Sequence, residues 1–207
     1  MASSSLSTPA SAQGRSSIRP LAIYWLIGAV VGGLSLRPEL ANATTSEFDT
    51  SHLLSIAIAL LATVVTTIAY SKIVTTGGRS LHLPTLFGFS VLNGLFETIL
   101  FIASFKIGVA LAAPLTAQPI WLFLAGSFTF FAYLGAIHAL FWIKILPSHL
   151  NKSPSVKNVR RVWIVGLTLV SLLWGWLYFG YQDFWSVVVL HALFDAGMVY
   201  SIRYRLA

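Results

Sequence analysis

The most regular feature of this chain is a succession of long apolar runs separated by short polar stretches. An α-helix needs about 20 mostly apolar residues to cross a bilayer, and the runs are close to that length. The fold class that we predict is therefore all-α, a polytopic membrane helical bundle in one domain over residues 21–205, behind a disordered polar tail at residues 1–20. The six predicted spans are Leu21–Leu36, Leu53–Tyr70, Leu86–Phe105, Pro119–Ile145, Val162–Phe179 and Phe184–Ile202.

The first run allows two interpretations. It is short for a span, and Ala41-Asn42-Ala43 follows it as a possible cleavage site of a signal peptide. The run also holds Gly28 and Gly32, whose spacing is typical of close helix packing in membranes. We interpret the run as a span, and a cleaved signal over residues 21–43 is the alternative.

Composition supports the membrane assignment. Hydrophobic residues make up 57% of the chain and charged residues only 9%, whereas a soluble domain carries about 25% charged residues. We therefore expect membrane lipids around the protein. The net charge of +7 does not indicate a nucleic-acid partner, because the basic residues lie between the apolar runs. The absence of cysteine excludes disulfides, thiolate metal sites and a cysteine nucleophile.

The distribution of basic residues predicts the orientation of the chain. When successive loops are assigned to alternate sides, only Arg37 and Lys106 of the 13 Lys and Arg residues lie on the less basic side. Cytoplasmic loops carry the excess of Lys and Arg, so both termini are predicted to be cytoplasmic. The acid-poor tail is compatible with a bacterial inner membrane or a thylakoid or plastid-type membrane, and the sequence does not choose between them.

Four carboxyl and imidazole side chains lie inside the predicted spans. Glu97 is on the third span, His138 on the fourth, and His191 and Asp195 are four residues apart on one face of the sixth. A helix rises about 1.5 Å per residue, and counting from the span ends places all four in one layer of the membrane. Each such group costs about 2.5–3.5 kcal/mol to insert, so we predict a functional site. The other histidines, at positions 52, 82 and 149, fall in loops or at span ends.

Three chemistries fit this set of side chains. A glutamate and a histidine can activate a water molecule while the second histidine and its neighbour stabilise an oxyanion. His138 and His191 can instead be axial ligands to a haem between two spans. The set can also bind a divalent metal or relay protons. Each residue alone also has a structural interpretation, such as a glutamate that is protonated and hydrogen-bonded to Asn93. Tyr70, Tyr133 and Tyr178 could line the site, although tyrosines on apolar helices more often serve packing.

The order and spacing of these residues resemble the CPBP family of intramembrane proteases, which includes the type II CAAX prenyl endopeptidases and the Abi proteins. Glu97 falls at the glutamate of the first family motif, His138 at the histidine of the second, and His191 and Asp195 at the last motif, His-x-x-x-Asn/Asp. The resemblance covers about residues 86–200. The first motif here, Phe96-Glu97-Thr98, lacks the second glutamate and the arginine that are typical of the family.

The resemblance implies an endopeptidase that hydrolyses membrane-embedded or lipidated protein substrates. Water would be activated by Glu97 and His138, and the oxyanion would be stabilised by His191 and Asp195. No cofactor is expected for such an endopeptidase. Haem or a divalent metal would be present only in the two other chemistries, the haem protein and the metal-binding or proton-relay protein. A catalytically inactive relative that acts as a membrane scaffold, assembly factor or regulatory factor is the main alternative function.

Overall fold

The computed structural model of the protein describes residues 18–41, 48–73, 80–142, 156–203 and 205–206, and these residues form helices and no β-strand. Six of the helices are long and apolar enough to cross a membrane. The predicted all-α membrane bundle is therefore confirmed. The elements are α1 (Ile18–Ser35), α2 (Arg37–Ala41), α3 (Thr50–Ile73), α4 (Leu83–Ala112), α5 (Pro119–Ile137), the π-helical turn η1 (His138–Trp142), α8 (Val156–Tyr181) and α9 (Phe184–Ile202).

The observed helices overlap all six predicted spans, and one clear difference is at the end of α4. That helix continues to Ala112, so the prediction that Lys106 ends it is wrong. The Lys106 Nζ lies 2.7 Å from the Glu39 Oε1 and 3.1 Å from the backbone oxygen of Ser35. A long lysine side chain can carry its charge to polar partners while its stem stays on apolar surface, and the helix therefore does not need to stop.

The start of the chain differs slightly from the predicted tail. Helix α1 begins at Ile18, three residues before the predicted span, so the last residues of the predicted tail are helical. The rest of that tail, residues 1–17, lies outside the described residues, as do Asn42 and Ala43 of the alternative cleavage site and His149.

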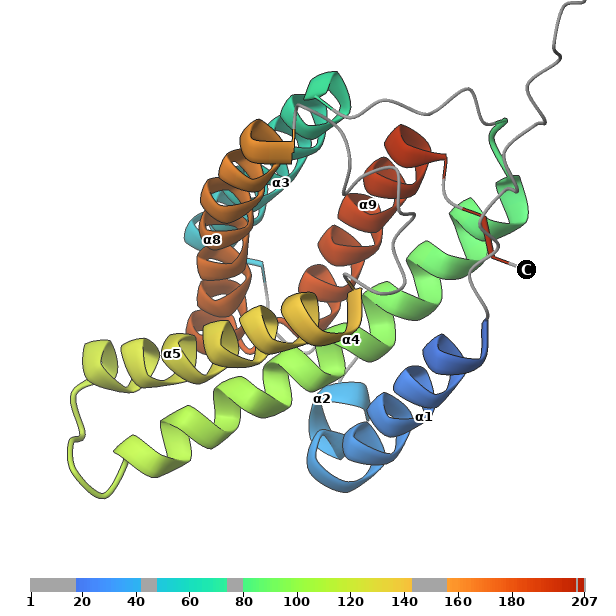
Figure 1. Cartoon of the computed structure of the whole chain (residues 1–207). Helices are drawn as coiled ribbons and strands as arrows, with labels where there is room; N and C mark the ends of the chain where they lie inside the picture. Colours follow the sequence, from blue (N-terminus) through green and yellow to red (C-terminus); the bar gives the residue numbers. More distant parts are fainter. Residues whose placement is uncertain (1–17, 42–47, 74–79, 143–155, 204, 207) are drawn as a thin grey trace, which may run out of the picture.

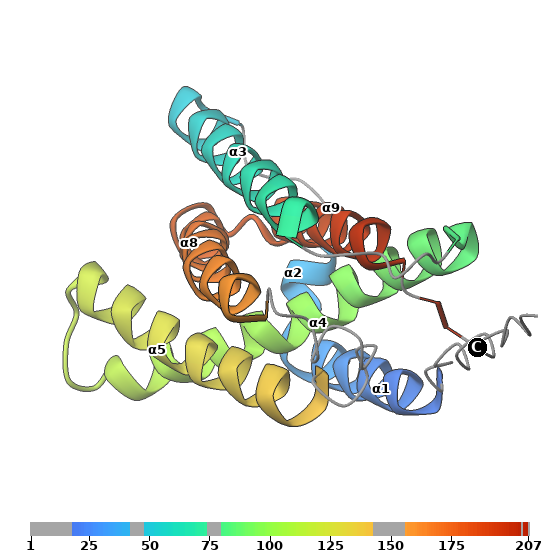
Figure 2. The same cartoon turned by 45° about the horizontal axis from the view of Figure 1, so that its top comes forward.

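Helix α4 lies at the centre of the arrangement. It packs against α1, α5 and α9, while α9 also packs against α3, and α3 packs against α8. Figures 1 and 2 show α4 and α5 as an antiparallel pair, with α9 between α4 on one side and α3 and α8 on the other. Side chains that point from α4 toward α9, α1 or α5 are therefore enclosed by helices.

Several glycines allow the close approach of helices to α4. A Cβ atom on Gly94 would lie 2.8 Å from the backbone of Ala192 on α9, and one on Gly28 would lie 2.7 Å from the backbone oxygen of Phe96. A Cβ atom on Gly32 would also meet a residue of α4, Ile99. The small-residue pattern of α1 therefore faces α4, as its spacing predicts.

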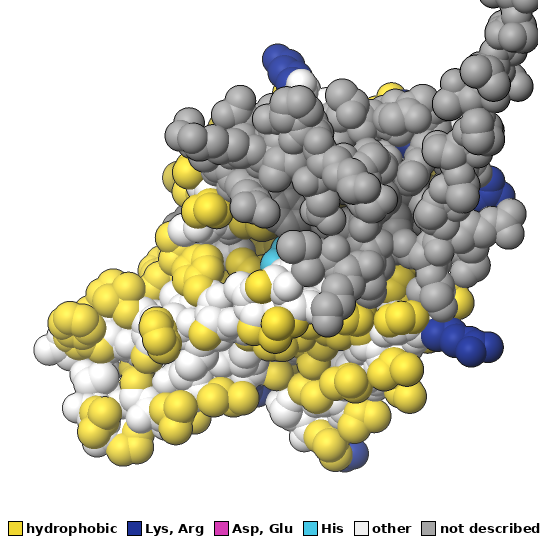
Figure 3. Space-filling model, viewed as in Figure 1, with side chains coloured by type: hydrophobic (Ala, Val, Ile, Leu, Met, Phe, Trp, Pro, Cys, Tyr) yellow, Lys and Arg dark blue, Asp and Glu magenta, His cyan; other side chains and the backbone are white. Residues whose placement is uncertain are grey.

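The outside of the bundle is apolar. Figure 3 shows hydrophobic side chains over the visible surfaces of the helices, with Lys and Arg at the periphery of this face. Such a surface suits the hydrocarbon of a bilayer, where charged side chains are costly. The most exposed large apolar side chains include Leu34, Leu115, Phe128, Leu140, Ile164 and Val165.

Glu39 lies on α2, outside the spans, and connects α2 to α4 and α8 by hydrogen bonds. Its Oε1 accepts hydrogen bonds from the Lys106 Nζ at 2.7 Å and from the Tyr178 hydroxyl on α8 at 2.8 Å. Burial by itself raises the pKa of the Glu39 carboxyl, but the bonds from Lys106 and Tyr178 outweigh burial and lower the pKa below its ordinary value. The ionised form of Glu39 is therefore favoured by folding.

This lowered pKa predicts a contribution to stability that is sensitive to acid. A carboxyl whose pKa is lower in the folded state stabilises the fold above the ordinary value of 4.5, and the contribution is lost as the pH falls through the lowered value. We expect thermal unfolding in detergent to show a smaller loss of stability below pH 4.5 for Glu39→Gln than for the wild type. Because Lys106 is 40% exposed, the difference should stay within about 1 kcal/mol. Equal acid sensitivity of the two proteins would contradict this assignment.

Candidate functional site

A polar stripe on α4 forms one wall of the candidate site. Ser90, Asn93 and Glu97 follow at steps of three and four residues, which places them on one helix face, and Gly94 lies next to Asn93 on that face. All four are buried. Since α4 packs against α1, α5 and α9, this stripe is enclosed within the helix bundle, and its polar atoms need partners from those helices.

The Glu97 carboxylate, which is only 3% exposed, is held through both of its oxygens. The Tyr24 hydroxyl on α1 donates to Oε1 at 2.9 Å. The Asn93 amide, one turn earlier on α4, donates to Oε2 at 2.7 Å. These bonds come from two different helices, so the plane of the carboxylate is fixed as well as its position.

The Asn93 amide connects the two carboxylates of the site. Its nitrogen also donates to the Asp195 Oδ2 at 2.9 Å. The orientation of the amide is determined by Trp25, whose Nε1–H lies 3.1 Å from the Asn93 Oδ1. Because an indole N–H can only donate, it must face the amide oxygen, and the NH₂ group must therefore face the carboxylates.

His191 lies buried beside both carboxylates. Its Nε2 is 3.5 Å from the Glu97 Oε2 and 3.7 Å from the Asp195 Oδ2, and its Nδ1 is 2.9 Å from the Thr98 hydroxyl. Two carboxylates face Nε2 and favour a proton on that nitrogen, and in the neutral ring with this proton Nδ1 accepts from Thr98. The ring packs on Phe101, with ring centres 5.5 Å apart, and on Trp174, at 4.9 Å.

His138 has the opposite arrangement of its ring nitrogens. It is the first residue of η1, and its Nδ1 lies 2.8 Å from the backbone oxygen of Leu134. A carbonyl oxygen only accepts, so Nδ1 carries the proton and the Nε2 of the neutral ring has a lone pair. The two histidines of the site are therefore suited to different roles, one as a proton acceptor and the other as a donor.

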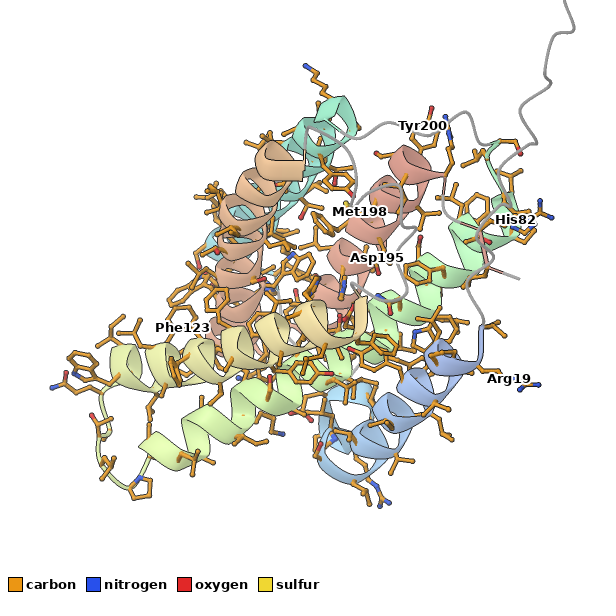
Figure 4. All side chains as sticks on the ribbon, in the orientation of Figure 1. Arg19, His82, Phe123, Asp195, Met198 and Tyr200 are labelled. Atoms are coloured by element: carbon orange, nitrogen blue, oxygen red, sulfur yellow. The ribbon has the colours of Figure 1, made fainter. Side chains whose placement is uncertain are left out.

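Glu97, His138, His191 and Asp195 all line one cavity between α4, α5 with η1, α8 and α9. The centre of a water molecule can move within a volume of about 60 Å³ in this cavity. One water molecule needs about 10–15 Å³ by that measure, so the cavity holds several. Figure 4 labels Asp195 and Met198 on α9, within the bundle, whereas Arg19 and His82 lie at its periphery. Apolar side chains form most of the remaining wall, among them Phe89, Leu167, Phe194, Met198, Val199 and Ile202.

The structure brings together all four residues that the sequence indicates, and their catalytic roles stay predictions. Three further residues of the site were not expected from the sequence: Tyr24 and Trp25 on α1, and Thr98 on α4. The i, i+4 spacing of Asn93 and Glu97 indicated their bond. No comparable pattern marks Tyr24 or Trp25, which are aromatic residues in an apolar helix.

Some of these residues could hold a metal ion. One ligand atom from each of Glu97, His191 and Asp195 lies within 4.8 Å of the others. Both carboxylates already accept from the Asn93 amide, however, and a cation at that point would compete with it. For a haem, the His191 Nε2 would have to turn from the carboxylates toward an iron. The observed contacts therefore favour acid–base chemistry on water.

Comparison with protein-family models, with curated proteins and with solved structures finds no match for this chain.

Proposed function

We propose that this protein is a membrane-embedded hydrolase that cleaves peptide bonds of membrane-embedded or lipidated protein substrates. The observation that carries the proposal is the meeting of Glu97, His138, His191 and Asp195 at one cavity, large enough for several water molecules, inside an apolar helix bundle. Packing alone does not need four ionisable groups from three helices, because each of them is costly in a membrane.

The roles follow from the hydrogen bonds of each group. Glu97 accepts a proton from a water molecule in the cavity, and the His138 Nε2, with its lone pair, shares in this activation. His191 directs a protonated Nε2 toward the Glu97 and Asp195 oxygens at the same cavity, where it donates to the oxygen that becomes negative. Asp195 favours the protonated ring of His191 during that step.

The reaction is an ordinary amide hydrolysis. The water oxygen bonds to the carbonyl carbon as its proton moves to Glu97, and the carbonyl oxygen becomes the oxyanion. The C–N bond then breaks, and the leaving nitrogen takes the proton from Glu97. One water is consumed, and a carboxylic acid and an amine are released, with no cofactor in the balance.

The choice of a peptide bond rests on the resemblance to the CPBP intramembrane proteases. The same resemblance assigns water activation to the positions of Glu97 and His138, which agrees with the roles that the contacts support. The apolar lining of the cavity, including Phe194 and Met198, also suits a substrate segment that lies in the membrane.

We predict that His138→Gln slows cleavage by about 100-fold, because glutamine keeps polar atoms at this point but cannot take up a proton. The measurement uses protein reconstituted in phosphatidylethanolamine–phosphatidylglycerol liposomes with a panel of single-span and lipidated peptides. Products are identified by mass spectrometry in water enriched in heavy oxygen. The new carboxyl group should contain one heavy oxygen, as hydrolysis requires.

His82→Gln is the matched control. His82 is also half-buried and bonds to Thr85, but it does not line the cavity. This variant should cleave at the wild-type rate. Equal cleavage by His138→Gln and the wild type, or no cleavage of any peptide in the panel, would contradict the proposed function.

A further inference from the structure

We infer that α1, which lies outside the part of the chain that resembles a protease, supplies a positioning residue to the site. The Tyr24 hydroxyl, supported by Tyr133, holds the Glu97 carboxylate in the orientation in which it accepts a proton from water. This inference rests on the proposed function, and it assigns to the first helix the orientation of the base.

The direction of the hydrogen bonds can be derived from their geometry. Tyr24 is 6% exposed, and its hydroxyl lies 2.9 Å from the Glu97 Oε1 and 3.1 Å from the Tyr133 hydroxyl. An ionised carboxylate can only accept, so Tyr24 uses its single proton on Glu97. Tyr133 must then donate to the Tyr24 oxygen. The hydrogen bonds therefore run in one direction, from Tyr133 to Tyr24 and from Tyr24 to the Glu97 carboxylate.

The Tyr24 bond is made to the oxygen that lies away from His191, so the other oxygen, which also accepts from Asn93, is the one that faces the second histidine. Tyr24 occupies Oε1, whereas Oε2 is the oxygen that lies 3.5 Å from the His191 Nε2. The bond from Asn93 fixes Oε2 alone, and a carboxylate that is held at one oxygen can still rotate about that point. The Tyr24 bond comes from another helix and fixes that rotation.

Several contacts of α1 hold Tyr24 at this place. The next residue, Trp25, donates to Asn93 at 3.1 Å. One turn later, Gly28 lies so close to α4 that an added Cβ atom would be 2.7 Å from the backbone oxygen of Phe96. Tyr24 is therefore on the face of α1 that packs tightly against α4, and its hydroxyl has little freedom to move.

Tyr24 also contacts the segment that carries His138. Its ring packs against Phe141 of η1, with ring centres 5.0 Å apart. Tyr133 and His138 belong to the continuous segment of α5 and η1. One side chain of α1 thus contacts Glu97 on α4 and the segment that carries His138.

The test removes only the hydroxyl. We expect Tyr24→Phe to lower kcat by up to about 100-fold with little change in KM, because a misoriented base affects the reaction more than substrate binding. Tyr133→Phe, which removes the supporting bond, should have a smaller effect in the same direction. Tyr178→Phe is the matched control: Tyr178 is 4% exposed and also donates to a glutamate, the Glu39 Oε1, at 2.8 Å.

A second readout does not depend on activity. The infrared bands of the Glu97 carboxyl group are obtained by subtracting the spectrum of Glu97→Gln from that of the wild type, and by repeating the subtraction in each tyrosine variant background. Loss of the Tyr24 bond should shift these bands, and Tyr178→Phe should leave them unchanged. A shift with no cleavage by the wild type would overturn the proposed function and leave the Tyr24–Glu97 contact in place. Unchanged bands or an unchanged kcat in a folded Tyr24→Phe protein would overturn the positioning role.

Discussion

Glu97→Gln is expected to reduce cleavage by about 10²–10⁴-fold, the range that general bases contribute to catalysis. Glutamine has nearly the shape of glutamate but cannot accept a proton from water. Its amide oxygen can still accept from Asn93, and its amide nitrogen can donate to the Tyr24 oxygen. The hydrogen-bond network therefore survives the change, and the loss should be in kcat and not in folding.

Measurement of this effect requires the liposome cleavage assay and a thermal unfolding curve for each protein. Glu39→Gln is the control, because Glu39 also accepts a hydrogen bond from a buried tyrosine but lies on α2, away from the residues that line the cavity. At neutral pH it should cleave as the wild type does. A Glu97→Gln protein that retains wild-type kcat would show that Glu97 is a structural group.

Gly94→Leu is expected to separate α4 from α9 and to destabilise the protein by about 3 kcal/mol, the upper end of the usual range for overpacking. A Cβ atom at this position would lie 2.8 Å from the backbone of Ala192. Backbone atoms cannot rotate aside as a flexible side chain can, so the two helices must move apart. His191 and Asp195, on either side of Ala192, would then lose their contacts with Asn93 and Thr98.

The matched control for this change is Gly88→Leu on the same helix. A Cβ atom on Gly88 meets no atom within 4 Å, and the residue is exposed. Unfolding of both variants in mixed detergent micelles should show a loss of stability for Gly94→Leu alone. If Gly94→Leu is as stable as Gly88→Leu, the close packing of α4 on α9 is not needed for the fold.

The predicted spans depend on local properties of the chain. A run of apolar residues forms a helix in a membrane because every backbone hydrogen bond must be made within the segment, whatever surrounds it. Phe184–Ile202 was therefore predicted with the observed bounds. The prediction that Lys106 ends α4 was wrong because the continuation of this helix depends on a contact between distant parts of the chain. The charge of Lys106 is compatible with a continuing helix because Glu39 and the backbone oxygen of Ser35, both far away in the sequence, lie next to it.

In the candidate site, too, the features that depend on local spacing could be predicted from the sequence. The depth of a residue in a span is its distance along the helix from the span end, and this distance grows by a constant rise per residue. Counting residues therefore placed Glu97, His138, His191 and Asp195 at one depth. The i, i+4 spacing likewise indicated the bond between Asn93 and Glu97. These four residues line one cavity in the structure.

The order of residues along the chain was enough to predict which helices form and which ionisable groups they carry at a similar distance from the span ends. The orientation of those groups depends on how the helices pack. Trp25 sets the direction of the Asn93 amide, Thr98 occupies one nitrogen of His191, and Tyr24 holds one oxygen of Glu97. The physical reason is that depth follows from a fixed rise along each helix, whereas a hydrogen bond between helices depends on which faces meet, and that is set by packing over the whole bundle.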